Sequence, residues 1–137
     1  MEIVLDTSPT EADRKAVQDA LVAFNRSQTT LRDYRDVAVL IRDDAGQTIG
    51  GLSGYTSYRW MFIELLFVPE SLRGQDIGTQ IMAKAEAHAR SLGLTGIWLD
   101  TFSFQARPFY EKLGYSVFGT IDNYPPGGAR YFLSKTL

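Results

Sequence analysis

The sequence predicts a mixed α/β (α+β) fold in which helices flank a largely antiparallel central sheet. Short stretches rich in β-branched and aromatic residues recur along the chain, two longer stretches repeat apolar residues at helical spacing, and Gly- or Pro-bearing turns separate them. The 137 residues suit one domain, and 45% hydrophobic with 22% charged residues is ordinary globular composition. We therefore expect a single domain over residues 1–137, with element order βα(α)βββαβαββ.

The first half of the chain is predicted to form a strand, a helix and three further strands. The segment EIVLD (2–6) is typical of a short strand, and a capping box beginning at Ser8 then opens a helix that ends near Ser27. Its apolar residues follow helical spacing: Val17, Ala20, Leu21 and Phe24. Residues 28–36 are polar and predict a loop or a short helical turn. The three strands are expected at VAVLIRD (37–43), TIGGLSGYTSYR (48–59) and WMFIELLFV (60–68).

The second half is predicted to alternate helices and strands. A helix from Asp76 to Leu92 has one buried face, which Gly93 ends. Its apolar positions are Ile77, Ile81, Ala85, Ala89 and Leu92, and His88 borders them as a structural residue. The remaining elements are a strand (95–102), a short helix closed by Gly114 (105–114), and two strands (115–121 and 130–137) around the turn NYPPGG.

Composition excludes several classes of function. A net charge of -2 and a pI near 5.3 give no basic footprint, so nucleic acid is not an expected partner. The chain has no cysteine and one histidine, so we expect no disulfide, no thiolate nucleophile and no metal site. No stretch reaches the ~18 apolar residues that span a bilayer, and no leader pattern opens the chain, so a soluble, cytoplasmic protein without a membrane partner is expected.

The stretch from Trp60 to Leu92 carries the strongest functional signal. A nearly all-apolar strand ends at Pro69, and the glycine-bearing turn LRGQDIGT (72–79) opens a helix. The first N–H groups of a helix lack internal partners and its dipole favours an anion, which predicts a phosphorylated cofactor. The turn has neither the Gly-Lys-Ser/Thr ending of a P-loop nor a G-x-G-x-x-G pattern, which disfavours an ATPase or a dehydrogenase. For the turn alone, an ordinary helix start is the competing interpretation.

Two motifs together resemble the GNAT superfamily of acyl-CoA-dependent N-acyltransferases: LLFVPESLRGQDIGTQIM and, after a strand, QARPFYEKLGY. The resemblance implies a GNAT fold, with acetyl-CoA as co-substrate and its pyrophosphate held by the pattern Arg/Gln-x-x-Gly-x-Gly/Ala. This pattern and the residue after it correspond here to Arg73, Gly74, Gln75, Asp76, Ile77, Gly78 and Thr79. Asp76 stands where the family usually has glycine. Its carboxylate either repels the pyrophosphate or caps its own helix.

Glu64 is the only charged residue among the nine of WMFIELLFV. Either its side chain faces water, or its burial serves a purpose. The resemblance implies a base that deprotonates the incoming amine, commonly through water. It also implies that this strand diverges from the next and contacts the pantetheine arm through Leu66, Phe67 and Val68.

The second motif contains the other predicted site residues. The resemblance implies that Tyr110 protonates the departing thiolate, because a phenol is neutral at working pH and donates its proton as charge develops on sulfur; a core aromatic is the alternative. Ser103 takes the place of an asparagine that binds pantetheine, or caps the following helix. Arg107 either approaches the 3′-phosphate of CoA or is simply solvated. Acceptor contacts are expected from Tyr34, Trp60, Asp122 and Tyr124.

These observations predict an N-acetyltransferase that moves an acetyl group from acetyl-CoA to a primary amine of a small molecule. Transfer is expected by direct attack in a ternary complex, because no cysteine is available to hold the acyl group. Two alternatives stay open: a non-catalytic acyl-CoA-binding sensor or interaction module, and an acetyltransferase for lysine or N-terminal amines of proteins. A homodimer is the expected assembly.

Overall fold

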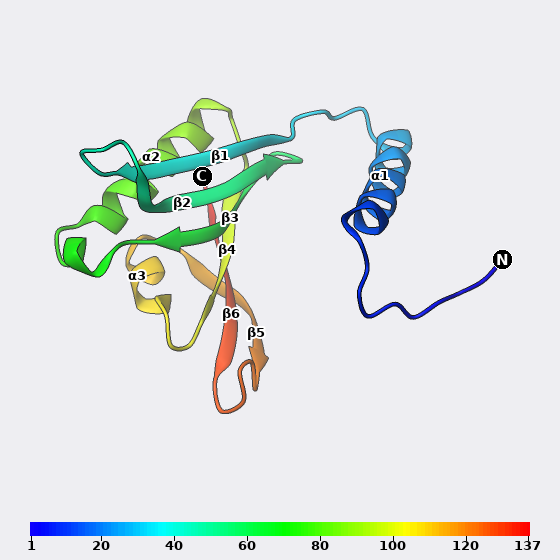
Figure 1. Ribbon diagram of the computed structural model, residues 1–137. Helices are drawn as coiled ribbons and strands as arrows, with labels where there is room; N and C mark the ends of the chain where they lie inside the picture. Colours follow the sequence, from blue (N-terminus) through cyan, green and yellow to red (C-terminus); the bar gives the residue numbers. More distant parts are fainter. The chain divides into compact units, whose positions relative to one another are not determined.

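A computed structural model describes all residues from 1 to 137 as two compact units, Met1–Arg32 and Asp33–Leu137 (Figure 1). The first unit holds one helix, and the second holds the sheet with the other helices. No helix has the length and apolar character needed to cross a membrane.

The first unit is built around α1 (Glu11–Gln28). The predicted capping box is present but lies two residues later: Thr10 caps the helix, accepting from the Asp13 N–H at 3.1 Å while Asp13 accepts from the Thr10 N–H at 2.9 Å. The strand predicted at EIVLD is wrong, since residues 2–6 have no regular secondary structure. The apolar residues Val17, Leu21 and Phe24 are exposed.

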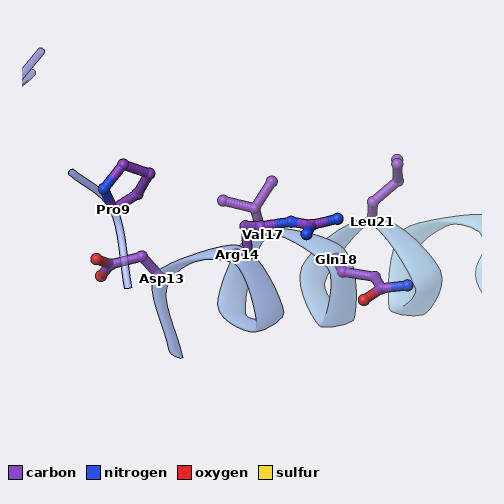
Figure 2. A pocket seen from close by; sticks show the side chains of 6 residues that line it. All are labelled: Pro9, Asp13, Arg14, Val17, Gln18 and Leu21. Carbon is purple, nitrogen blue, oxygen red and sulfur yellow. The ribbon is translucent and has the colours of Figure 1, made fainter. Parts of the chain in front are cut away.

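A groove runs along one face of α1, beside the chain that leads into the helix. Figure 2 shows Pro9 across from the helix and Val17 and Leu21 on the helix itself. Its full lining is Pro9, Asp13, Arg14, Val17, Gln18 and Leu21. None of these residues is among the predicted site residues.

The second unit contains a six-stranded sheet with the order β1-β2-β3-β4-β6-β5. Its strands are β1 (Arg35–Arg42), β2 (Thr48–Ser57), β3 (Trp60–Phe67), β4 (Gly96–Phe102), β5 (Ser116–Asp122) and β6 (Ala129–Thr136). All neighbouring pairs are antiparallel except β3 and β4, which are parallel. A parallel pair needs a crossover connection, and α2 (Ile77–Ser91) provides it. The predicted fold class, a mixed and mostly antiparallel sheet flanked by helices, is confirmed.

The core lies between the sheet and α2, which covers one face of the strands in Figure 1. The buried positions of α2 are Ile81, Met82, Ala85, Glu86 and Ala89. Leu92 follows the helix and is exposed, so its predicted place in the buried face is wrong. His88, which was predicted to border that face, is exposed. Glu86 is buried with partners: Lys135 Nζ lies 2.6 Å and the Tyr115 hydroxyl 3.5 Å from its Oε1.

Two short helices flank the region where the site is expected. The 3-10 helix η1 (Glu70–Leu72) leads from β3 to the glycine-bearing turn, and α3 (Arg107–Lys112) follows β4. Pro108 lies in the first turn of α3, where its missing N–H costs nothing. The helix begins at Arg107 and ends at Lys112, two residues inside the predicted range of 105–114 at each end.

The sheet face opposite α2 carries a row of aromatic side chains. The rings of Phe62 and Trp98 stack with centroids 4.1 Å apart, Tyr55 meets Phe62 at 5.5 Å, and Tyr34 stacks on Tyr55 at 5.3 Å. Successive side chains of a strand point to opposite faces, so this row alternates with core residues such as Met61 and Ile97. We call this side of the sheet the aromatic face.

Candidate active site

The central feature of the site is an opening between β3 and β4. These two strands are paired only from Trp60 opposite Gly96 to Ile63 opposite Leu99. Beyond that point the rest of β3 pairs only with β2, and the rest of β4 only with β6. One backbone edge on each side of the opening is therefore without a strand partner, and its N–H and C=O groups can bond a guest. The divergence of strands that the resemblance implied is present here.

Glu64 lies at the start of the opening, in a β-bulge. Gly54 of β2 is opposite Ile63, but Ser53 is opposite Leu65, so Glu64 is the extra residue on β3. Bulges re-aim a side chain and often adjoin active sites. The close approach of the strands requires glycine at position 54, since a Cβ there would lie 2.0 Å from the Phe62 carbonyl oxygen.

The Glu64 carboxylate is exposed and has no hydrogen-bond or ion-pair partner in the chain. Of the two interpretations, exposure to water is therefore the correct one. The side chain lies near Tyr34, whose pKa is raised by burial, by its hydrogen bond to Asp36 and, less strongly, by the charge of Glu64. A free, hydrated carboxylate at the opening has the chemistry of a base that works through water.

The turn before α2 has the geometry of an anion site. Gly74 and Asp76 have φ of 78° and 59°, and α2 begins at Ile77. None of the backbone N–H groups from Gly74 to Thr79 donates a hydrogen bond within the chain. These donors meet the positive end of the helix dipole, so the turn favours a phosphate.

Asp76 makes no side-chain bond to its own helix, so the capping interpretation is wrong. Its left-handed conformation gives the physical reason why glycine is usual at this place in the family, because residues with a Cβ are strained there and Asp and Asn are tolerated best. The carboxylate thus stands free beside the unpaired N–H groups.

The other residues of the turn connect it to β3 and α3. Arg73 Nε donates to the Val68 carbonyl oxygen at 3.0 Å, and its guanidinium lies 5.7 Å from the centre of the Phe67 ring. A Cβ at Gly78 would lie 3.2 Å from the Phe109 ring, so the absence of a side chain lets α2 begin against α3. The turn, the end of β3 and α3 therefore form one continuous wall.

Tyr110 of α3 is 6% exposed, yet its hydroxyl has no hydrogen-bond partner. The chain has no fully buried side-chain oxygen or nitrogen without a partner, so this hydroxyl reaches solvent-accessible space. Burial and, second, the charge of Asp100 raise the pKa of Tyr110 to about 12. The phenol is therefore protonated at any working pH and its O–H is free to donate.

Ser103 and Arg107 have partners in the chain. The Ser103 hydroxyl accepts from the Ala129 N–H at 3.1 Å and joins the end of β4 to β6, and α3 has no side-chain cap, so the capping alternative for Ser103 is wrong. The Arg107 Nε lies 3.0 Å from Glu111, and its guanidinium is 4.5 Å from the centre of the Tyr131 ring. Contacts of either residue with CoA stay predictions.

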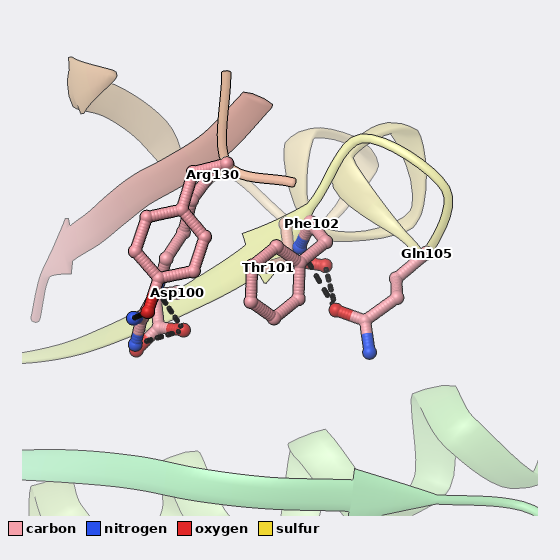
Figure 3. Close-up of polar contacts among 6 residues, drawn as sticks. Asp100, Thr101, Phe102, Gln105 and Arg130 are labelled. Atoms are coloured by element: carbon pink, nitrogen blue, oxygen red, sulfur yellow. Dashed lines mark hydrogen bonds and ion pairs between the residues drawn. The ribbon is translucent and has the colours of Figure 1, made fainter. Parts of the chain in front are cut away.

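Sequence reasoning missed the polar cluster of Asp100, Arg130 and Gln105 shown in Figure 3. Arg130 donates from Nε to Asp100 at 2.9 Å and from Nη1 to the Tyr124 hydroxyl at 3.1 Å. Gln105 Oε1 accepts from the Phe102 N–H at 2.8 Å. Asp100 is the only charged residue within its apolar strand, which is the same signal that singled out Glu64. Its partner Arg130 lies 30 residues further along the chain, so the pair could not be predicted from local sequence.

The predicted acceptor residues are dispersed. Tyr34 lies near Glu64 on the aromatic face and Tyr124 belongs to the Arg130 cluster. Trp60 packs over Gly96 at the paired end of β3, away from the opening, and Asp122 is exposed at the end of β5. No group of three or more His, Cys, Asp or Glu side chains is placed to hold a metal ion.

The sequence matches a family model described as the acetyltransferase (GNAT) family over residues 4–115. An acetyltransferase from Agrobacterium fabrum is 37% identical over 133 residues, which cover 97% of this chain and 96% of that protein. Blasticidin-S acetyltransferase from Streptomyces morookaense is 38% identical over 95 residues, 69% of this chain and 70% of that protein.

Solved structures agree with these matches. A crystal structure of a protein from Agrobacterium tumefaciens has a TM-score of 0.95 and 36% identity, with both chains covered over 100% of their length. An acetyltransferase from Bacillus cereus has a TM-score of 0.82 and 29% identity, with 98% of each chain covered.

Proposed function

Because this chain belongs to the GNAT acetyltransferase family, we propose that it transfers an acetyl group from acetyl-CoA to the primary amine of a small molecule. One observation carries the proposal: the opening between β3 and β4 adjoins a helix start with unpaired N–H groups and a tyrosine hydroxyl without a partner. The relative named blasticidin-S acetyltransferase supports a small-molecule acceptor.

The residues around the opening fit acetyl-CoA. The N–H groups from Gly74 to Thr79 would bind the pyrophosphate, with the charge of Arg73 beside them. The free backbone edge from Leu66 through Phe67 to Val68 would hydrogen-bond the pantetheine arm, and Ser103 and Arg107 lie on the α3 side. Acetyl-CoA supplies the activated thioester.

In the proposed reaction, Glu64 accepts a proton from the ammonium of the acceptor through a water molecule. The nitrogen lone pair attacks the thioester carbonyl carbon, forming the C–N bond of the amide, and N–H groups of β3 stabilise the developing negative charge on the carbonyl oxygen. The C–S bond breaks, and Tyr110 donates its proton to the departing sulfur. The second proton, which the nitrogen loses as the amide forms, passes through water to the Tyr110 phenolate and restores the phenol. Alignment of the two substrates in the opening supplies much of the rate.

A thiol-release screen tests the proposal. Acetyl-CoA is incubated with the protein and a panel of primary amines, and free CoA is measured by its thiol. We expect release that depends on both enzyme and amine. Binding of CoA in calorimetry without release by any amine would replace the enzyme with the acyl-CoA sensor. Release only with lysine-containing or N-terminal peptides would assign a protein acetyltransferase.

We further propose that the protein forms a homodimer. The exposed apolar side chains of Leu40 in β1 and Ile121 in β5 are surface that association would remove from water. Sedimentation velocity at micromolar concentration should give twice the mass of the chain, and a monomer would refute the proposal.

A further inference from the structure

Three aromatic side chains beside the opening form an exposed surface that the proposed reaction does not use. Phe102 stacks on Phe104 with ring centroids 5.4 Å apart and an interplanar angle of 3°, and it packs against Tyr124 at 5.3 Å. Phe104 is 70% exposed and Tyr124 is 42% exposed. We call Phe102, Phe104 and Tyr124 the aromatic platform. Large apolar groups gathered in one exposed place are typical of a binding surface.

The platform is continuous with the site. Asp100 is the first residue of β4 past its pairing with β3, and its charge acts on Tyr110. The same carboxylate holds Arg130, whose guanidinium lies 5.4 Å from the centre of the Phe102 ring and 5.2 Å from that of Tyr124. The ion pair of Asp100 and Arg130 therefore connects the surroundings of Tyr110, the proposed proton donor, to the platform.

The loop that carries Phe104 is held by side-chain hydrogen bonds. Gln105 accepts from Phe102 N–H and from the Thr101 hydroxyl, as Figure 3 shows, and Thr101 in turn accepts from the Ala106 N–H at 3.3 Å. Ser103 is bonded to Ala129 on β6. A surface fixed in advance loses little entropy when a ligand binds, so the platform is suited to recognition.

The charges around the platform select the kind of group that fits it. Arg130 already lies over Phe102 and Tyr124, and a second cation on these rings would be repelled by it. Arg130 forms an ion pair with Asp100, whereas the carboxylate of Glu64 at the opening has no cationic partner. An ammonium is thus drawn to the opening, whereas the platform suits an uncharged ring.

We infer that the acceptor is a primary amine bearing an uncharged aryl or heteroaryl group, which stacks on the aromatic platform while the amine lies in the opening. This inference rests on the proposed function for the position of the amine. A stacked aromatic pair raises the affinity of a complex by about 3- to 10-fold, in addition to the gain from burying apolar surface.

The test compares amines that differ only in the ring. Benzylamine, phenethylamine and 4-phenylbutylamine are each paired with the cyclohexyl analogue of the same linker length, and kcat/KM is measured by thiol release. We expect at least one aryl amine to be preferred about 3- to 10-fold, with the difference in KM, since the platform does not touch the reacting atoms. Equal kcat/KM within every pair would overturn the inference.

Variants at position 104 assign the preference to the platform. Phe104→Leu keeps an apolar side chain without a ring, and Phe104 is exposed, so folding is not at risk. The preference should fall to within about 2-fold in this variant, with CoA affinity unchanged. Phe118→Leu is the matched control, because Phe118 is 62% exposed on β5 and lies outside the platform. An aryl preference that survives Phe104→Leu would contradict the platform.

A measurement without turnover separates this inference from the proposed function. Saturation-transfer NMR of phenethylamine on the CoA-bound protein reports ring contacts directly. A signal that Phe104→Leu removes would support the platform even if no amine releases thiol. No signal with the native protein would overturn it, whatever the outcome of the thiol-release screen.

Discussion

At the scale of single residues, the site is defined by polar groups that lack partners. Glu64 is exposed and unpaired, the Tyr110 hydroxyl is unpaired at the edge of the core, and the N–H groups before α2 donate to nothing. Other buried polar groups of the chain, such as Glu86, are bonded. Unpaired groups persist in a stable fold when solvent or a ligand satisfies them, which is what a binding site requires.

The role of Glu64 predicts a pH-dependent loss of activity. Glu64→Gln removes the base, so kcat/KM should fall by roughly 10²-fold near pH 7. Part of the activity should return as the pH rises toward the pKa of the acceptor ammonium, because a larger fraction of the acceptor is then already the free amine. Asp44→Asn, a charge-matched change in the exposed turn between β1 and β2, should keep the native profile. A Glu64→Gln profile that parallels the native one would exclude the base.

Asp76 predicts that two substitutions strengthen CoA binding to different extents. Asp76→Asn removes the charge and keeps a residue that tolerates the left-handed conformation, so it isolates the repulsion of phosphate. Asp76→Gly also relieves the backbone strain and should add about 1 kcal/mol to the free energy of unfolding.

Calorimetric titration with CoA and denaturant unfolding measure the two effects. Both variants should bind CoA more tightly than the native chain, and the gain should shrink at high salt, which screens exposed charges. Unchanged or weaker binding by Asp76→Asn would show that the carboxylate does not face the phosphates.

At the scale of elements, the site depends on one parallel pair within an otherwise antiparallel sheet. The pairing of β3 with β4 ends at Ile63 and Leu99, and the bulge at Glu64 lies next to that end. The crossover from β3 to β4 then brings the start of α2 to the open end of the strands. The opening, the proposed base and the proposed anion site thus follow from the same short stretch of chain.

The bulge predicts that Gly54→Ala damages the site. Its Cβ would lie 2.0 Å from the Phe62 carbonyl oxygen, so β2 and β3 must separate beside Glu64, at a cost of about 1–3 kcal/mol in the free energy of unfolding. We expect kcat/KM to fall in the fraction that remains folded. Gly119→Ala is the control, because its Cβ has only an ordinary contact at 3.9 Å. Equal stability and activity of the two variants, by urea unfolding and thiol release, would contradict this account of the bulge.

At the scale of the whole molecule, local sequence patterns predicted most of the helices and strands. They predicted few of the contacts between those elements. The helical spacing from Ile77 to Ala89 and the turn at Gly74 correctly predicted α2 and its start. The strand predicted at residues 2–6 is absent, because strand propensity is a weak local preference that the context of the whole chain can override. Likewise the pair of Asp100 and Arg130 depends on the register of β4 against β6, which no local pattern encodes.

The central claim is that acetyl transfer takes place at the β3–β4 opening with Tyr110 as proton donor, and a pair of tyrosine variants tests it. Tyr110→Phe removes only the unpaired hydroxyl. Tyr115→Phe removes the neighbouring hydroxyl, which bonds Glu86; its ring centroid is 6.1 Å from that of Tyr110. With the pKa of Tyr110 at about 12, the donor form is complete below pH 10 and declines only as pH approaches 12, so the comparison holds across pH 7 to 9.

The decisive measurement is kcat with a verified acceptor, alongside the Kd of CoA, for these two variants. We predict that Tyr110→Phe lowers kcat by roughly 10²-fold or more with little change in Kd, whereas Tyr115→Phe keeps kcat and loses about 1 kcal/mol of stability. A native kcat for Tyr110→Phe, or an equal loss in both variants, would contradict the account.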